Sequence, residues 1–208
     1  MIKIAIVDDH HLFRAGLSSM FSKSNIIEVV GSFANGEAYL DFLGDNKKVD
    51  IVLLDISMPL IDGLEVLDIC KKKYPNIKSI MLSMHNDGNY IVQSVKKGAM
   101  GYLLKNVDQK ELTQAIENVY RGQKYFNKET TDLMLTNMAI EKEEIKKLSD
   151  REQEILVHIA DGLTTKEIAQ KLILSTRTIE THRVNMMKKL NVKNTAELIK
   201  KAIELNIL

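Results

Sequence analysis

Five short apolar runs, each followed by a stretch with helical spacing, constrain the fold of residues 1–121 more than any other feature of the chain. A strand-length apolar run with few polar interruptions is typical of a strand buried on both faces. Such strands belong to parallel sheets that are covered by helices on both sides. The expected strands are residues 2–7, 26–30, 51–54, 77–82 and 100–104.

The stretches between these runs carry apolar residues at helical spacing. We expect helices at residues 11–21, 36–43, 63–74 and 89–97, and a closing helix at 112–120. The alternation predicts an α/β domain with a doubly wound, five-stranded parallel sheet over residues 1–121. A strand order of 2-1-3-4-5 would make the first and third strands neighbours.

The rest of the chain has a different character. Residues 122–147 are polar and mixed in charge, which predicts a linker with one short helix. Residues 148–208 show no strand pattern and four helical segments, so they are expected to form a small all-α domain. The expected helix starts are capping boxes at Ser149 with Glu152 and at Thr164 with Glu167, an N-cap at Ser175, and a start at Asn194 or Thr195.

Composition excludes several classes of protein. The chain is 45% hydrophobic and 27% charged, which is ordinary for a globular protein and too apolar for a disordered one. Its one cysteine, Cys70, excludes an intrachain disulfide and a cysteine-based zinc site. The sequence lacks a membrane-spanning run and a signal-peptide pattern, so we expect a cytoplasmic protein with no membrane partner.

Acidic residues gather where the expected sheet ends. Asp8 and Asp9 follow the first strand and Asp55 follows the third. Ligands of doubly wound sheets bind at the carboxyl ends of the strands, where the order reverses. Three converging carboxylates repel one another unless a cation lies between them, and Mg²⁺ or Mn²⁺ is the natural occupant of an oxygen-rich site. A carboxylate beside such an ion can attack phosphorus and form an acyl phosphate.

Two further polar residues end the remaining strands. Lys105 can place a point charge on phosphoryl oxygens, and the Ser83 hydroxyl can donate a hydrogen bond to one of them. The adjacent His10 and His11 are interpreted as residues that open a helix and point apart, not as metal ligands.

Four segments resemble the receiver domain of two-component response regulators: VDDH at 7–10, LLDISMPLIDG at 53–63, LS at 82–83 and GYLLK at 101–105. The resemblance spans residues 1–121 and implies a flavodoxin-like fold and a sensor histidine kinase as partner. It implies that Asp55 is the phosphoacceptor. The implied ion ligands are Asp9, Asp55 and the main-chain carbonyl of Ser57, with Asp8 assisting through water, and the implied switch residues are Ser83, Tyr102 and Lys105.

The third helix of the C-terminal segment combines an apolar stripe with a basic face. At 100° per residue the stripe holds Ile179, His182, Met186 and Leu190. The opposite face offers bases, a hydroxyl and methyl groups, which suit phosphates and base edges in a DNA major groove. This face carries Arg177, Glu180, Thr181, Val184 and Lys188.

Residues 148–192, LSDREQEILVHIADGLTTKEIAQKLILSTRTIETHRVNMMKKLNV, resemble the LuxR-type helix-turn-helix of NarL/FixJ-like response regulators. The resemblance implies a scaffold helix at 149–161, a support helix at 165–172 and a recognition helix at 176–190. The implied base contacts are Glu180, Thr181 and Val184, and the residues implied nearer the DNA backbone are Arg177, Thr178, Arg183 and Lys188.

The last helix carries more apolar surface than a small bundle needs. This surface favours a homodimer, which would place two recognition helices about 10 base pairs apart on an inverted repeat of double-stranded DNA. The expected dimer residues are Leu198, Ile199, Ala202 and Ile203.

These features predict a DNA-binding response regulator in which a histidine kinase phosphorylates Asp55 and thereby controls dimerisation and transcription. The chain is expected to catalyse only its own phosphoryl transfer and dephosphorylation. One alternative is a magnesium-dependent phosphohydrolase, a class that usually has a second acid two residues after its nucleophile, where this chain has Ser57. The other alternative is a DNA binder that does not depend on phosphorylation and keeps the receiver for dimerisation.

Overall fold

The computed structural model describes residues 1–45, 48–84, 86–146, 148–205 and 207–208, and the side chains of these residues except 140–146. The chain divides into two compact units, Met1–Leu135 and Thr136–Leu208. Each unit has its own hydrophobic core and is considered by itself.

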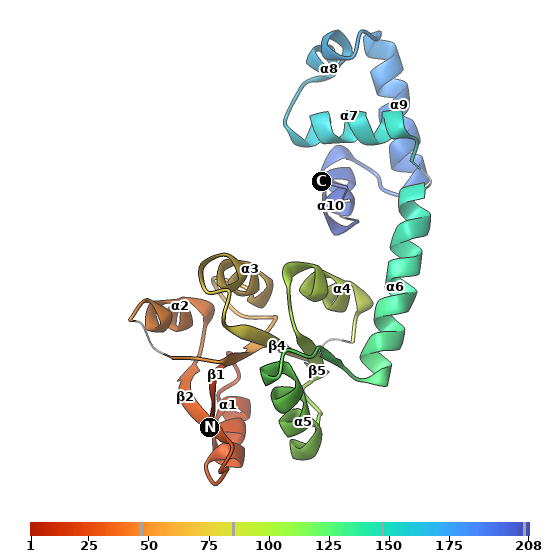
Figure 1. The fold of residues 1–208 in the computed structure, drawn as a ribbon. Coiled ribbons are helices and arrows are strands. Elements are labelled where there is room, and N and C mark those ends of the chain that lie inside the picture. The colour runs from red at the N-terminus through yellow and green to blue at the C-terminus, as the bar shows by residue number, and fades with distance from the viewer. Residues whose placement is uncertain (46–47, 85, 147, 206) are drawn as a thin grey trace. The chain divides into compact units, whose positions relative to one another are not determined.

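The N-terminal unit is a parallel sheet with helices on both faces (Figure 1). The strand order is β2-β1-β3-β4-β5-β6, and every neighbouring pair is parallel. The predicted order of the first five strands is confirmed. The strands are β1 (Ile2–Val7), β2 (Ile27–Phe33), β3 (Ile51–Asp55), β4 (Lys78–Ser83), β5 (Gly101–Leu104) and β6 (Tyr125–Phe126).

The predicted number of strands is wrong, because a sixth strand extends the sheet. β6 pairs with β5 through Gly101 with Tyr125 and Tyr102 with Phe126. It has 2 residues, which is too short for an apolar run to be visible in the sequence. The compact N-terminal unit therefore extends past residue 121 and includes β6.

The strands are apolar throughout because their side chains serve two cores. In β1, Ile4 and Ile6 pack into one core, whereas Ala5 and Val7 pack into the other. Helices α1 (His11–Phe21) and α5 (Gln109–Tyr120) cover the first face of the sheet. The second face is covered by α2 (Gly36–Gly44), α3 (Gly63–Lys73) and α4 (Gly88–Lys97).

Helix α6 (Lys128–Lys146) replaces the short helix expected between the domains. It has 19 residues, and the division between the two compact units falls within it. Leu133 and Met134 of its first half pack against the core of the N-terminal unit. Among the residues described, we find no helix with both the length and the apolar character needed to span a lipid bilayer.

In the described part of the C-terminal unit, the helices that follow α6 surround one core. Its predicted helix starts are confirmed: Ser149 and Thr164 form capping boxes, and Ser175 and Asn194 accept hydrogen bonds from the backbone amides of Thr178 and Glu197. The helices are α7 (Asp150–Ala160), α8 (Thr165–Lys171), α9 (Thr176–Lys189) and α10 (Thr195–Glu204).

Glu152 fastens the start of α7 to the last turn of α9. Its buried carboxylate accepts hydrogen bonds from the Ser149 amide at 2.8 Å and from Lys189 Nζ at 2.6 Å. Burial raises the pKa of Glu152, but the hydrogen bonds from Lys189 and Ser149 outweigh burial and hold the pKa below its ordinary value.

We expect Glu152→Gln to lower the free energy of opening of α7 and α9 by about 1–2 kcal/mol at neutral pH, because a charge-assisted hydrogen bond is lost. A carboxyl group whose pKa is depressed by folding stabilises the native state above its unfolded pKa. The difference between the two proteins should therefore vanish as the pH falls below 4.5 and through the lower folded-state pKa. Amide hydrogen exchange on the full chain measures this energy.

The control for this prediction is Glu154→Gln on the same helix. Glu154 is exposed and pairs with its helical neighbour Arg151 at the surface. This change should alter the same exchange rates by less than about 0.5 kcal/mol. Equal effects of the two substitutions would show that Glu152 does not link the helices.

Candidate functional site

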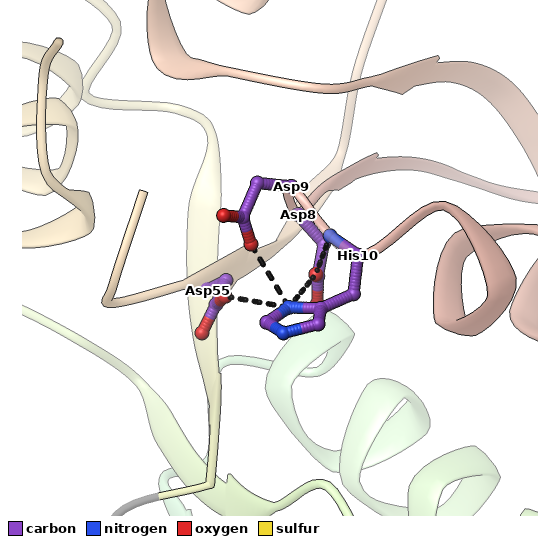
Figure 2. Close-up of side chains that lie close together, drawn as sticks. All are labelled: Asp8, Asp9, His10 and Asp55. Carbon is purple, nitrogen blue, oxygen red and sulfur yellow. Dashed lines mark hydrogen bonds and ion pairs between the residues drawn. The ribbon is translucent and has the colours of Figure 1, made fainter. Parts of the chain in front are cut away.

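The carboxyl ends of β1 and β3 bring acidic side chains together. Val7 of β1 and Leu54 of β3 are register partners. The residues that follow them, Asp8 and Asp55, therefore lie side by side. Figure 2 shows Asp8, Asp9, His10 and Asp55 converging on one point. Their potential ligand atoms all lie within 4.8 Å of one another. The side chains of Asp8 and Asp55 are buried, with 2% and 3% of their surfaces exposed.

Lys105 supplies the positive charge of the cluster. It follows β5, and its Nζ lies 2.8 Å from Asp55 Oδ2 and 2.8 Å from Asp8 Oδ2. The structure therefore brings Lys105 to Asp55, although 50 positions separate them in the chain. This geometry places an ammonium group where a phosphoryl group on Asp55 would carry its charge.

The ionisation of Asp55 reflects opposing effects. Burial raises its pKa, the hydrogen bond from Lys105 lowers it, and the charge of Asp8 raises it; the net pKa lies above the ordinary value. Asp55 Oδ1 also accepts a hydrogen bond from the Ile56 amide at 2.8 Å. The side chain is thus held in one orientation in surroundings that disfavour its negative charge.

His10 is the N-cap residue of α1, as expected, and its imidazole also lies within the acidic cluster. Its Nδ1 lies 2.9 Å from Asp9 Oδ1, 3.2 Å from Asp8 Oδ1 and 3.9 Å from Asp55 Oδ2. The His10 amide donates to Asp8 Oδ1 at 2.8 Å, which turns the N-cap residue of α1 back over the acids. The sequence signal was its position directly after paired acids at a strand end. His11 is the first residue of α1 and is exposed.

The predicted switch residues lie beside this cluster. Ser83 ends β4 and Tyr102 is on the neighbouring strand β5, where both side chains are fully buried. Burial raises the pKa of Tyr102 to about 12, and a hydrogen bond with Ser83 acts in the opposite direction. Ser57 is exposed in the loop that follows β3, two residues after Asp55.

The donor set fits a divalent cation. Three carboxylates provide the oxygen ligands that Mg²⁺ and Mn²⁺ take in proteins. Asp8 Oδ2 is buried and accepts no hydrogen bond from any residue the structure describes, although it forms an ion pair with Lys105. A cation would offset the repulsion between the carboxylates.

A tight backbone contact fixes the loop that carries Asp55. Gly63 begins α3, and its amide donates to the Ile56 carbonyl at 2.8 Å. A Cβ atom at Gly63 would lie only 1.9 Å from the Asp55 carbonyl oxygen. Only glycine allows α3 to approach the end of β3 so closely.

The C-terminal unit presents the predicted face of α9. Ile179, Met186 and Leu190 are buried in the core, and His182 is half-buried. The opposite side chains are exposed, and 43% of the surface of Val184 is accessible. The exposed residues are Arg177, Glu180, Thr181, Val184 and Lys188.

Four residues predicted near DNA have partners within the unit. Glu180 accepts a hydrogen bond from the Thr165 hydroxyl at 2.5 Å, and the Thr181 hydroxyl donates to the Arg177 carbonyl at 2.9 Å. Arg183 donates to Thr165 Oγ1 at 2.9 Å and to Thr195 Oγ1 at 2.8 Å, so its guanidinium joins α9 to the starts of α8 and α10. The Thr178 hydroxyl lies 2.7 Å from that of the N-cap residue Ser175. The predicted role of Arg183 at the DNA backbone overlooked these internal contacts.

The predicted dimer residues are divided between the core and the surface. Leu198 and Ala202 are fully buried in the core of their own unit, so their prediction as contacts of a second copy is corrected. Ile199 is half-buried against the same core, whereas Ile203 is 59% exposed. The apolar face of α10 is thus largely occupied by α7 and α9.

Comparisons with known proteins match both parts of the chain. Residues 4–117 match the family described as response regulator receiver domain, and residues 146–202 match the bacterial regulatory proteins of the luxR family. The transcriptional regulatory protein MctR of Rhizobium johnstonii is 36% identical over 98% of this chain and 94% of its own length. The oxygen regulatory protein NreC of Staphylococcus aureus is 36% identical over 100% of this chain and 99% of its own length.

Solved structures of RcsB are similar over nearly the whole chain. RcsB from Salmonella enterica serovar Typhimurium, bound to the promoter rprA in the presence of the phosphomimetic BeF₃⁻, has a TM-score of 0.63 and 25% identity and covers 100% of this chain and 99% of its own. A structure of two RcsB dimers bound to two parallel DNAs has a TM-score of 0.62 and 26% identity, with 98% of each chain covered. The chain therefore belongs to the two-component response regulators that join a receiver domain to a LuxR-type helix-turn-helix, and it is a DNA-binding regulator of transcription.

Proposed function

We propose that Asp55 accepts a phosphoryl group from a sensor histidine kinase and that the phosphorylated chain binds inverted-repeat DNA as a homodimer. One observation carries this proposal: the buried Asp55 carboxylate lies 2.8 Å from Lys105 Nζ and within reach of the acids Asp8 and Asp9. A nucleophile, a cation site and a fixed ammonium group are the parts that phosphoryl transfer needs.

The residues divide the chemistry between them. Asp9, Asp55 and the main-chain carbonyl of Ser57 would hold Mg²⁺ or Mn²⁺, with Asp8 acting through water. When bound, the ion supplies charge neutralisation for the phosphoryl oxygens. An Asp55 oxygen attacks phosphorus, an O–P bond forms, and the P–N bond to the histidine of the kinase breaks. Lys105 then faces phosphoryl oxygens.

The phosphoryl group would act on Ser83 and Tyr102. It adds a charge of roughly −1.5 to −2 and three strong acceptors beside a buried hydroxyl. If Ser83 donates to a phosphoryl oxygen, its hydrogen bond with Tyr102 changes. The side chains on the surface around β5 would then shift, and the contacts of this surface with its partners would change.

The test compares full-length protein with and without beryllofluoride and Mg²⁺. We expect the analogue to raise the affinity of the protein for operator DNA selected from the source genome. The molecular mass of the protein measured by sedimentation should also rise, to that of a dimer. Unchanged affinity and mass would support a DNA binder that does not depend on phosphorylation. Turnover of a small phosphomonoester by the protein would support the phosphohydrolase.

We assign the exposed face of α9 to DNA. Glu180, Thr181 and Val184 would meet base edges, while Arg177 and Lys188 would meet phosphates. Arg183 would set the position of the helix, since its guanidinium joins α9 to the starts of α8 and α10, and Thr178 would support the N-cap residue Ser175. Ile203, with Ile199 beside it, remains available for a second copy on α10.

Lys188→Ala and Thr181→Ala should separate these roles. Loss of a phosphate contact weakens binding to every sequence and lowers the slope of log affinity against log salt by about 1. Loss of a base contact instead changes the relative affinities for different DNA sequences, by about 1–3 kcal/mol for a base change at the contacted position. Fluorescence anisotropy with operator variants at several salt concentrations measures both. Identical profiles for the two proteins would contradict the assignment.

A further inference from the structure

We infer that His10 is a nitrogen ligand of the ion site and that it makes this site prefer a first-row transition ion, such as Mn²⁺, over Mg²⁺. The inference rests on the proposed function, because it concerns the same ion site. It adds to the site a residue that the sequence analysis interpreted as opening a helix and not as a metal ligand.

The distances around His10 Nδ1 fit an octahedral shell. Ligand bonds of about 2.1 Å place neighbouring ligand atoms about 3.0 Å apart and opposite ones about 4.2 Å apart. Nδ1 lies 2.9 Å from Asp9 Oδ1, 3.2 Å from Asp8 Oδ1 and 3.9 Å from Asp55 Oδ2. Nδ1 and Asp9 Oδ1 are thus spaced like neighbouring ligands of one ion, and Nδ1 and Asp55 Oδ2 nearly like opposite ones, while Asp8 acts through water as proposed above.

A hydrogen bond donated by His10 does not account for all three of its contacts with the acids. Figure 2 shows the ring nitrogen facing oxygens of Asp8, Asp9 and Asp55 at once. A single N–H on Nδ1 can point at only one of the three oxygens. A cation bound to the lone pair of Nδ1 would interact with every oxygen simultaneously.

Lys105 already contacts part of this site. Its Nζ lies 3.3 Å from His10 Nδ1 and 2.8 Å from Asp55 Oδ2, so the ion would replace the ammonium group at Nδ1. On Asp8 the two are separated, because Lys105 contacts Oδ2 whereas His10 contacts Oδ1. The His10 side chain is 62% exposed, which gives an ion and its waters access from solvent.

The nitrogen ligand decides which ion is favoured. Mg²⁺ strongly prefers oxygen ligands and dehydrates reluctantly. Imidazole suits first-row transition ions, and carboxylates suit Mn²⁺ as well as Mg²⁺. Replacing one oxygen ligand by Nδ1 should thus raise the affinity for Mn²⁺ relative to that for Mg²⁺.

The test uses tag-free, full-length protein and Mn²⁺ alone as the probe. Pulsed electron paramagnetic resonance should detect a ¹⁴N coupling from a directly bound imidazole in the unchanged protein and none in His10→Ala. Titrations of Mn²⁺, with Mg²⁺ as competitor, should show that His10→Ala lowers the ratio of Mn²⁺ to Mg²⁺ affinity by about tenfold. His11→Ala is the matched control, since His11 is the exposed neighbour on α1, and it should behave as the unchanged protein.

The outcomes separate the inference from the proposed function. Binding of Mn²⁺ without a ¹⁴N coupling, or an unchanged affinity ratio in His10→Ala, overturns the role of His10 and leaves the carboxylate site intact. Failure of the unchanged protein to bind either ion overturns the ion site itself. Loss of binding of both ions in Asp9→Asn, together with the ¹⁴N coupling in the unchanged protein, supports the ion site and the role of His10 in it.

Discussion

Asp55→Asn is expected to abolish the incorporation of phosphoryl groups from a small-molecule donor and with it the donor-dependent gain in DNA affinity. The amide oxygen of asparagine is a poor nucleophile, so no acyl phosphate can form. The side chain keeps its shape, and its carbonyl oxygen can still accept the hydrogen bond from the Ile56 amide. Mass spectrometry of the intact chain and DNA titrations measure the two effects.

The same substitution should raise the free energy of unfolding at neutral pH. Burial raises the pKa of Asp55, which means that its ionised form opposes folding. A raised carboxyl pKa makes stability fall as the pH rises through the folded-state value, and asparagine removes this dependence. Asp41→Asn, an exposed change on α2, is the control and should leave phosphorylation intact. Incorporation of a phosphoryl group by the Asp55→Asn protein would refute the assignment.

Gly63→Ala should have the largest effect on the fold of the N-terminal unit. The new Cβ would lie 1.9 Å from the Asp55 carbonyl oxygen and 2.9 Å from the Ile56 Cα, so backbone atoms must move. We expect a loss of about 3 kcal/mol in stability, as in overpacked cores. Because the displaced backbone carries Asp55, phosphoryl incorporation should also slow. Hydrogen exchange of β3 in the full chain measures the stability.

Gly16→Ala is the matched control for this prediction. Gly16 lies within α1, and beyond the adjoining backbone of its own helix a Cβ there would meet no described atom within 4 Å. The same chemical change should therefore stabilise the helix by about 1 kcal/mol, since alanine is the better helix former. Effects of equal sign at Gly16 and Gly63 would show that the close approach at Gly63 is not what requires glycine.

The sequence predicted the main elements because strands buried on both faces leave a continuous apolar signal. β1 and α1 have the predicted bounds, and the other strands and helices of the sheet domain differ from theirs by a few residues. β6 was missed because 2 residues carry no periodicity, and its place depends on backbone pairing with Gly101. Local pattern thus predicts elements that supply their own core contacts.

The acidic site was predictable in part. The carboxyl-end rule placed Asp8, Asp9 and Asp55 together without any knowledge of distances. His10 was missed because its orientation depends on the N-cap conformation, with φ −77° and ψ 99°, and on a backbone hydrogen bond to Asp8. Residue type and spacing do not specify this orientation of the imidazole ring.

The helical unit shows the same limit. The spacing of α9 separated its inward from its outward side chains, but it did not reveal that Arg183 reaches Thr165 and Thr195. The apolar face of α10 was evident, whereas its burial beneath α7 and α9 required the packing of three helices. Charge and hydropathy predict a surface, and only tertiary contacts show what covers it.

The residues that stabilise α9 and those proposed to read DNA lie on opposite sides of the helix. Ile179 and Met186 hold α9 in place from within, while Thr181 and Val184 project outward and add nothing to that core. If the outward positions read DNA as proposed, substitutions there would change the preferred promoter without disturbing the core of the unit. A lineage of duplicated regulators built on this scaffold could diversify its target genes rapidly while each copy inherits the same rigid frame.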